Sequence, residues 1–95
     1  MLHILMRSPF QMDMLLLTNF LKSNDDLVTL QDSVIITIDD NIFIKNLLSI
    51  PIQIYAIKQD IYARGIQKKI SDKVNIIDYV QFVLLTEKHK KQISW

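Results

Sequence analysis

The segment that most constrains the fold is Asp26–Ser33. A mostly apolar run over residues 27–30 breaks abruptly into the polar triplet Gln31-Asp32-Ser33. A short apolar run between turn-forming residues is typical of a strand that is buried on both faces of a parallel sheet. Polar residues at the carboxyl end of such a strand lie where open α/β sheets usually make their contacts. The segment therefore predicts a central strand with a polar edge.

Other apolar segments predict strands on either side of this one, at residues 2–6, 52–57 and 74–77, with a short final strand at 93–95. Segments with helical spacing separate them. Strands that alternate with helices are the signature of right-handed parallel crossovers, and the 95 residues fit one domain. We therefore expect a single domain, residues 1–95, with the α/β architecture of a three-layer α/β/α sandwich.

The first helix is predicted to begin at Ser8, with Pro9 in its first position and Gln11 completing a capping box. Four apolar residues then fall on one helical face, which we expect to be buried. These residues are Met12, Leu15, Leu16 and Phe20.

The last helix is predicted to begin after Asp78, with Gln81 in the capping-box position. Lys88, Lys90 and Lys91 follow near its negative C-terminal end, where cations are favourable. The residues expected on its inner face are Tyr79, Phe82, Val83 and Thr86.

Residues 34–38 are rich in β-branched side chains, which favour a strand. A strand there would require a tight hairpin, and residues 31–33 lack the Gly or Asn that such hairpins need. We therefore predict a helical turn, followed by a helix that Pro51 ends. Residues 59–64 predict one or two further helical turns, with Gly65 as a left-handed C-terminal cap.

The composition excludes thiol chemistry and a glycine-rich phosphate-binding loop. The chain has no cysteine, so it can form neither a disulfide, a thiolate metal site nor a persulfide. Its single glycine cannot build a phosphate-binding loop, and its net charge of +1 is too balanced for a dedicated nucleic-acid-binding domain. We expect no cofactor and no metal. The N-terminus lacks a signal-peptide pattern and no apolar run could cross a bilayer, so we expect a cytoplasmic protein.

Several residues are candidates for binding. Arg7 and the amides after Ser8 could hold an anion, but an ordinary helix cap is the favoured interpretation. Trp95 either packs back onto its own fold or fills a pocket on a partner, and the sequence favours neither. By their position at strand ends, or as a terminal aromatic, six residues are the predicted subunit interface: Phe10, Gln31, Asp32, Arg64, Tyr79 and Trp95.

Several short motifs occur in a specific order along the whole chain. They are Met1-Leu2-His3, Arg7-Ser8-Pro9-Phe10, Leu30-Gln31-Asp32, Tyr55-Ala56 with Asp60, Ala63-Arg64-Gly65, Ile77-Asp78-Tyr79, Phe82-Val83, Leu85-Thr86, Lys88-His89 and Trp95. In this order the chain resembles the DsrH-like subunits of TusBCD-type sulfurtransferase complexes, which belong to the DsrEFH family.

The resemblance implies a parallel five-stranded sheet and a cytoplasmic heterohexamer with two copies each of this subunit, a TusC-like and a TusD-like subunit. Such a complex relays sulfur from TusA towards TusE for 2-thiouridine at the tRNA wobble position, with the catalytic cysteine on TusD. This subunit would then be non-catalytic; the alternative is a tRNA-contacting module that uses Lys88–Lys91, for which a solvated helix end is the favoured interpretation. Ser33 stands where the family often has Gly, and a positive φ there would be strained.

Overall fold

Five parallel strands form one sheet in the order β4-β3-β2-β1-β5 in the computed structural model, which describes residues 1–95. Every neighbouring pair is parallel, so the sheet is wholly rather than mainly parallel. The strands are β1 (Leu2–Leu5), β2 (Asp26–Thr29), β3 (Gln53–Ile57), β4 (Asn75–Ile77) and β5 (Gln92–Ser94). The expected α/β/α sandwich with five strands is confirmed.

The middle strand is β2, as Asp26–Ser33 predicts, and all four of its residues are buried. Its side chains alternate between the two faces of the sheet. Leu27 belongs to a core cluster of 12 buried residues, and Val28 belongs to a second cluster of 6 on the other face. Two separate hydrophobic layers therefore meet at this strand.

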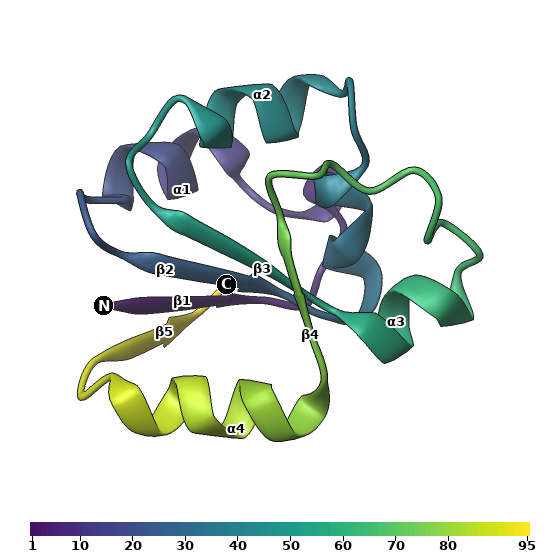
Figure 1. Ribbon diagram of the computed structural model, residues 1–95. Helices are drawn as coiled ribbons and strands as arrows, with labels where there is room; N and C mark the ends of the chain where they lie inside the picture. The colour runs from purple at the N-terminus through teal and green to yellow at the C-terminus, as the bar shows by residue number, and fades with distance from the viewer.

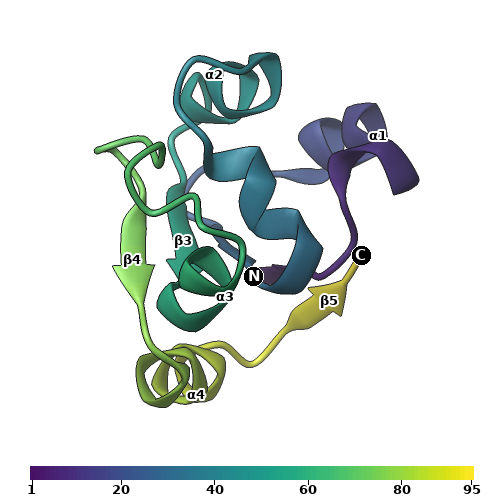
Figure 2. The same ribbon diagram turned by 90° about the vertical axis from the view of Figure 1, so that its right-hand side faces the viewer.

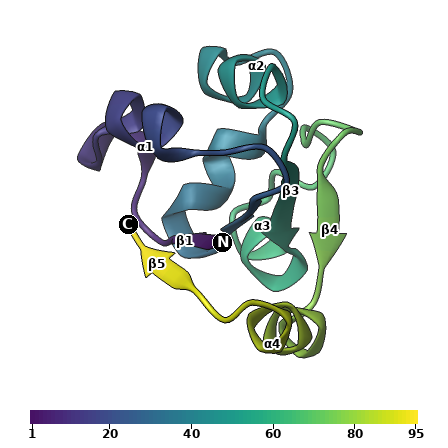
Figure 3. The same ribbon diagram turned by 90° about the vertical axis from the view of Figure 1, so that its left-hand side faces the viewer.

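Helices cover both faces of the sheet (Figure 1). Helices α1 (Met14–Phe20) and α2 (Ile42–Leu48) lie over one face, and α4 (Tyr79–Lys88) lies over the other (Figure 3). Helix α3 (Lys58–Ala63) and the 3₁₀ helix η2 (Gln31–Thr37) lie at the carboxyl ends of the strands, which Figure 2 views from the front. A short 3₁₀ helix, η1 (Pro9–Gln11), follows β1. None of the helices has the length and apolarity that crossing a bilayer requires.

Of residues 34–38, those up to Thr37 lie in the 3₁₀ helix η2, so the prediction of a helical turn in place of a strand is confirmed. Their β-branched side chains are accommodated in η2, where Val34 and Ile36 are fully buried in the larger core cluster. Ile38 then pairs with Ile70 in an isolated antiparallel bridge, so the segment is tied to the loop before β4. Gly65 has a φ of +65° at the end of α3, which confirms the predicted left-handed cap.

The N-terminal helix differs from its prediction. Ser8 caps only η1, through a 3.2 Å bond from the Phe10 amide, and Asp13 then caps α1 by accepting from the Leu16 amide at 2.9 Å. This new start rotates the buried face, so Leu17 is fully buried while Leu15 is 73% exposed. The prediction of one helix from Ser8 with Leu15, Leu16 and Phe20 inside is therefore wrong.

Helix α4 has the predicted start and a different inner face. Asp78 accepts from the Gln81 amide at 2.8 Å, and the Gln81 side chain accepts from the Asp78 amide at 2.9 Å. Phe82 and Leu85 face the sheet, whereas Val83 is 52% exposed. Tyr79 is also exposed, so the inner face predicted from periodicity is only partly right. The helix carries apolar residues on more than one side, and periodicity alone could not choose between them.

We expect Leu17→Ala to lower the free energy of unfolding by about 2–5 kcal/mol, because it leaves a cavity in the larger core cluster. Leu15→Ala on the same helix should change it by less than about 0.5 kcal/mol, because that side chain is mostly exposed. Urea unfolding of both variants measures the difference. Equal losses would contradict the buried face described here.

Candidate functional site at the carboxyl edge of the sheet

The carboxylate of Asp60 links the ends of three strands. Asp60 lies in the first turn of α3, directly after β3, and is only 9% exposed. Its Oδ2 accepts from the Gln31 amide, after β2, at 2.8 Å. Its Oδ1 accepts from the Tyr79 hydroxyl, after β4, at 3.0 Å. One partly buried charge therefore holds the polar edge of the sheet together.

Gln31 adopts the left-handed conformation, with a φ of 54°. L-residues rarely occupy this region, and the hydrogen bond to Asp60 helps to hold it there. The family pattern pointed to Ser33 as the strained position, but the positive φ lies two residues earlier. Ser33 instead uses its buried hydroxyl to accept from the Leu30 amide at 2.9 Å and to contact the Leu5 carbonyl at 2.6 Å.

Arg64 completes this polar group. Its guanidinium donates to Asp32 at 2.7 Å and to the backbone carbonyl of Asp60 at 3.2 Å. The Asp32 side chain is 65% exposed, so this ion pair contributes no more than about 1 kcal/mol to stability. The pair therefore forms a charged surface feature beside the buried Asp60.

The environment of Tyr79 changes its acidity. Loss of hydration, the hydrogen bond to Asp60 and the negative charge of that carboxylate raise the pKa of the phenol above its ordinary 10.0, and Arg64 partly offsets the rise. The phenol therefore stays protonated and donates to Asp60 at neutral pH. The hydrogen bonds of Asp60, Tyr79 and Arg64 all connect segments of this chain with one another.

Two of the six predicted interface residues lie outside this group. Phe10 is 81% exposed and meets the ring of Phe43 edge-on, with centroids 5.7 Å apart. Beside it, a shallow cavity of about 230 Å³ opens between α1 and α2. Its lining residues are Met14, Leu15, Thr18, Ile42, Phe43 and Asn46.

Trp95 packs back onto its own fold, which is one of the two alternatives that the sequence left open. Its indole Nε1 donates to Nδ1 of the buried His3 at 3.1 Å, and its ring meets Phe20 edge-on at 5.6 Å between centroids. His3 contacts Asp25 through its other ring nitrogen at 2.9 Å. Neither this cluster nor the central place of Asp60 was predicted, because the residues that contact one another lie far apart in the chain.

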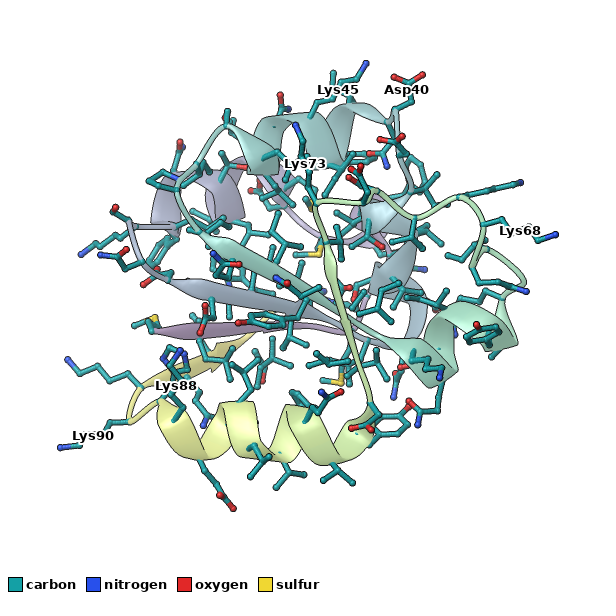
Figure 4. The ribbon with its side chains drawn as sticks, viewed as in Figure 1. Asp40, Lys45, Lys68, Lys73, Lys88 and Lys90 are labelled. Carbon is teal, nitrogen blue, oxygen red and sulfur yellow. The ribbon has the colours of Figure 1, made fainter.

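The lysines labelled in Figure 4 lie at more than one place on the molecule. Figure 4 shows Lys45 beside Asp40, with Lys68 on a different side of the molecule. Lys88 and Lys90 lie at the end of α4 (Figure 4). There Lys88 approaches the buried carboxylate of Asp26 at 3.6 Å, and His89 contacts the same carboxylate at 2.6 Å.

Arg7 and Ser8 both make hydrogen bonds within their own segment. Its guanidinium donates to the Gln11 carbonyl at 3.4 Å, and the Ser8 hydroxyl accepts from the Phe10 amide. The favoured interpretation, a helix cap beside a surface arginine, therefore agrees with the structure.

The chain is similar to known proteins over its whole length. The profile of the family described as DsrH like protein matches residues 7–92. The chain is 54% identical to Protein TusB of Buchnera aphidicola subsp. Baizongia pistaciae over 95 residues, all of both chains. It is 42% identical to Protein TusB of Escherichia coli K12, again over the full length of both.

The fold of this chain resembles those of solved structures. YchN of E. coli has a TM-score of 0.78 at 16% identity, over 99% of this chain and 97% of that one. A solution NMR structure of Tm0979 from Thermotoga maritima has a TM-score of 0.67 at 28% identity, over 96% and 97% of the two chains. These similarities support the same sandwich architecture.

We expect Asp60→Asn to move the pKa of Tyr79 back towards its ordinary value, because the substitution removes the negative charge beside the phenol. Ultraviolet absorbance of the phenolate follows the titration, and its loss in Tyr79→Phe assigns the signal. Tyr62→Phe is the matched control and should leave the Tyr79 titration in place. An unchanged Tyr79 titration in Asp60→Asn would contradict the contact.

Proposed function

Because the chain belongs to the DsrH-like family, we propose that it is a non-catalytic subunit of a sulfur-relay complex that serves tRNA modification. The observation that carries this proposal is similarity over the full length to proteins named TusB, at 42–54% identity. The absence of cysteine supports the non-catalytic part, because persulfide sulfur needs a thiol as its carrier. The chain would act as a single domain, residues 1–95.

The family resemblance supplies the proposed partners. They are TusC-like and TusD-like subunits in a cytoplasmic heterohexamer with two copies of each subunit. TusD would carry the reactive cysteine, TusA would deliver sulfur and TusE would receive it on the way to 2-thiouridine at the tRNA wobble position. The contribution of this chain would be to assemble and shape the complex.

The surface supports a role in assembly. Exposed apolar side chains gather at two places, where Phe10, Leu15 and Ile42 surround the α1–α2 cavity, and where Val80, Val83 and Leu84 form the outer side of α4. Contiguous exposed apolar surface is typical of protein–protein contact. The six predicted interface residues remain proposals, and four of them lie in the polar group around Asp60.

The alternative, direct tRNA contact through Lys88–Lys91, has less support. Lys88 and His89 both approach Asp26, so part of the basic end is already neutralised within the fold. Lys45 and Lys68 lie elsewhere and cannot extend this end into one basic face (Figure 4). Phosphate binding depends on several cations that act together.

Co-expression of this chain with its TusC-like and TusD-like partners should yield one stable assembly, because exposed apolar surface would then be covered. The chain alone should be unstable or self-associating. Size-exclusion chromatography with light scattering distinguishes these states. A monodisperse lone monomer without affinity for those partners would contradict the proposal.

Two exposed aromatic residues provide a more specific test of association, Phe10 as the variant and Tyr62 as the control. Phe10→Ala should weaken association by more than about 1 kcal/mol, if Phe10 is an interface anchor. Tyr62, which is 55% exposed and outside the predicted interface, provides the control. Tyr62→Ala should leave association unchanged, and equal effects of both variants would remove Phe10 from the interface.

A further inference from the structure

His3 is a fully buried histidine that contacts a partner on each side of its ring. It belongs to β1 and is 0% exposed. On one side, its Nε2 lies 2.9 Å from Oδ2 of Asp25. On the other side, its Nδ1 lies 3.1 Å from Nε1 of Trp95, and the two rings stack with centroids 6.1 Å apart. The histidine therefore bridges the start of the central strand and the residue that follows β5.

Donor and acceptor chemistry fixes the proton on this ring. The indole Nε1 of tryptophan can only donate, so Nδ1 of His3 must accept and carries no proton. The single proton of the neutral ring then lies on Nε2, where it is donated to Asp25. The structure therefore contains the neutral Nε2–H tautomer.

The charged groups near His3 are the carboxylate of Asp25 and the α-ammonium of Met1, which contacts that carboxylate. Asp25 precedes β2, and its other carboxylate oxygen accepts from the Met1 α-ammonium at 3.1 Å. Burial raises the pKa of Asp25, but hydrogen bonds from His3, the Lys22 amide and the α-ammonium outweigh burial and lower it overall. Asp25 therefore remains ionised while histidines titrate. Phe20 and the β5 residue Ile93 contribute no charge at their contacts with this cluster.

We propose that protonation of His3 detaches Trp95 and loosens β5 from the edge of the sheet. A second ring proton from solvent has only Nδ1 to occupy, and there it would face the indole N–H, donor against donor. His3 is 0% exposed and its contact with Trp95 is partly buried, so the new ring proton finds no replacement acceptor without movement. The ring keeps its bond to Asp25, so the Trp95 contact is the one that breaks.

Strand β5 is suited to this movement. It has only three residues and pairs with β1 alone (Figure 3). The Trp95 amide donates to the Ile4 carbonyl at 2.8 Å, so the indole contact and the last backbone bond of the strand lie side by side. Loss of the indole contact therefore acts directly on the end of β5. Its release would expose the edge of β1 to solvent or to another strand.

The single tryptophan makes the inference measurable in the full chain, alone or assembled with unlabelled partner subunits. With ¹⁵N-indole tryptophan in this chain only, the Nε1–H signal of Trp95 is followed from roughly pH 8 to pH 5, where histidines titrate. We expect the docked signal to be lost reversibly at the acidic end, while far-ultraviolet circular dichroism retains the helical signal. Nitrogen chemical shifts of His3 should report the Nε2–H tautomer at the alkaline end.

The two histidines provide matched variants. His3→Gln, whose amide does not titrate in this range, should abolish the change in the Trp95 signal, whereas His89→Gln should preserve it. A Trp95 signal that is constant over the range would overturn the inference, as would the same transition in His3→Gln or its loss in His89→Gln. If His3→Gln does not fold, the wild-type tautomer decides, because a proton on Nδ1 at the alkaline end is incompatible with the inference.

Discussion

The burial of β2 on both faces is the constraint on which the rest of the structure depends. Its apolar side chains need one hydrophobic layer on each side of the sheet. Helices α1 and α2 supply one layer, while a single helix, α4, supplies the other. Apolar residues remain exposed on the outer side of α4 and around the α1–α2 cavity, which are the surfaces proposed for assembly.

Two carboxylates secure opposite ends of this sheet. At the carboxyl ends of the strands, Asp60 joins the segments after β2, β3 and β4. At the amino end of β2, Asp25 holds His3, whose ring also holds Trp95. Both carboxylates are largely buried and hydrogen-bonded, which is the condition under which a buried charge is tolerated. Each one converts a local sequence feature into a contact between distant segments.

The sequence predicted the features that depend on neighbouring residues. The central strand, the Asp78–Gln81 capping box and the left-handed Gly65 all have short-range causes. The face of α1 was mispredicted and that of α4 was only partly predicted, because a cap at Asp13 shifts one helix and apolar residues occupy several sides of the other. Four of the six predicted interface residues lie near Asp60, but its hydrogen bonds span up to 29 positions in sequence. No local pattern reports such contacts.

The proposed role assigns surfaces, and no sulfur chemistry, to this chain. Isotopically labelled persulfide sulfur passed through the reconstituted complex, followed by mass spectrometry of each subunit without reduction, tests that claim most directly. The proposal predicts labelled sulfur on a cysteine of a partner and an unchanged mass for this chain at every stage of transfer. A covalent sulfur adduct on this chain would contradict it.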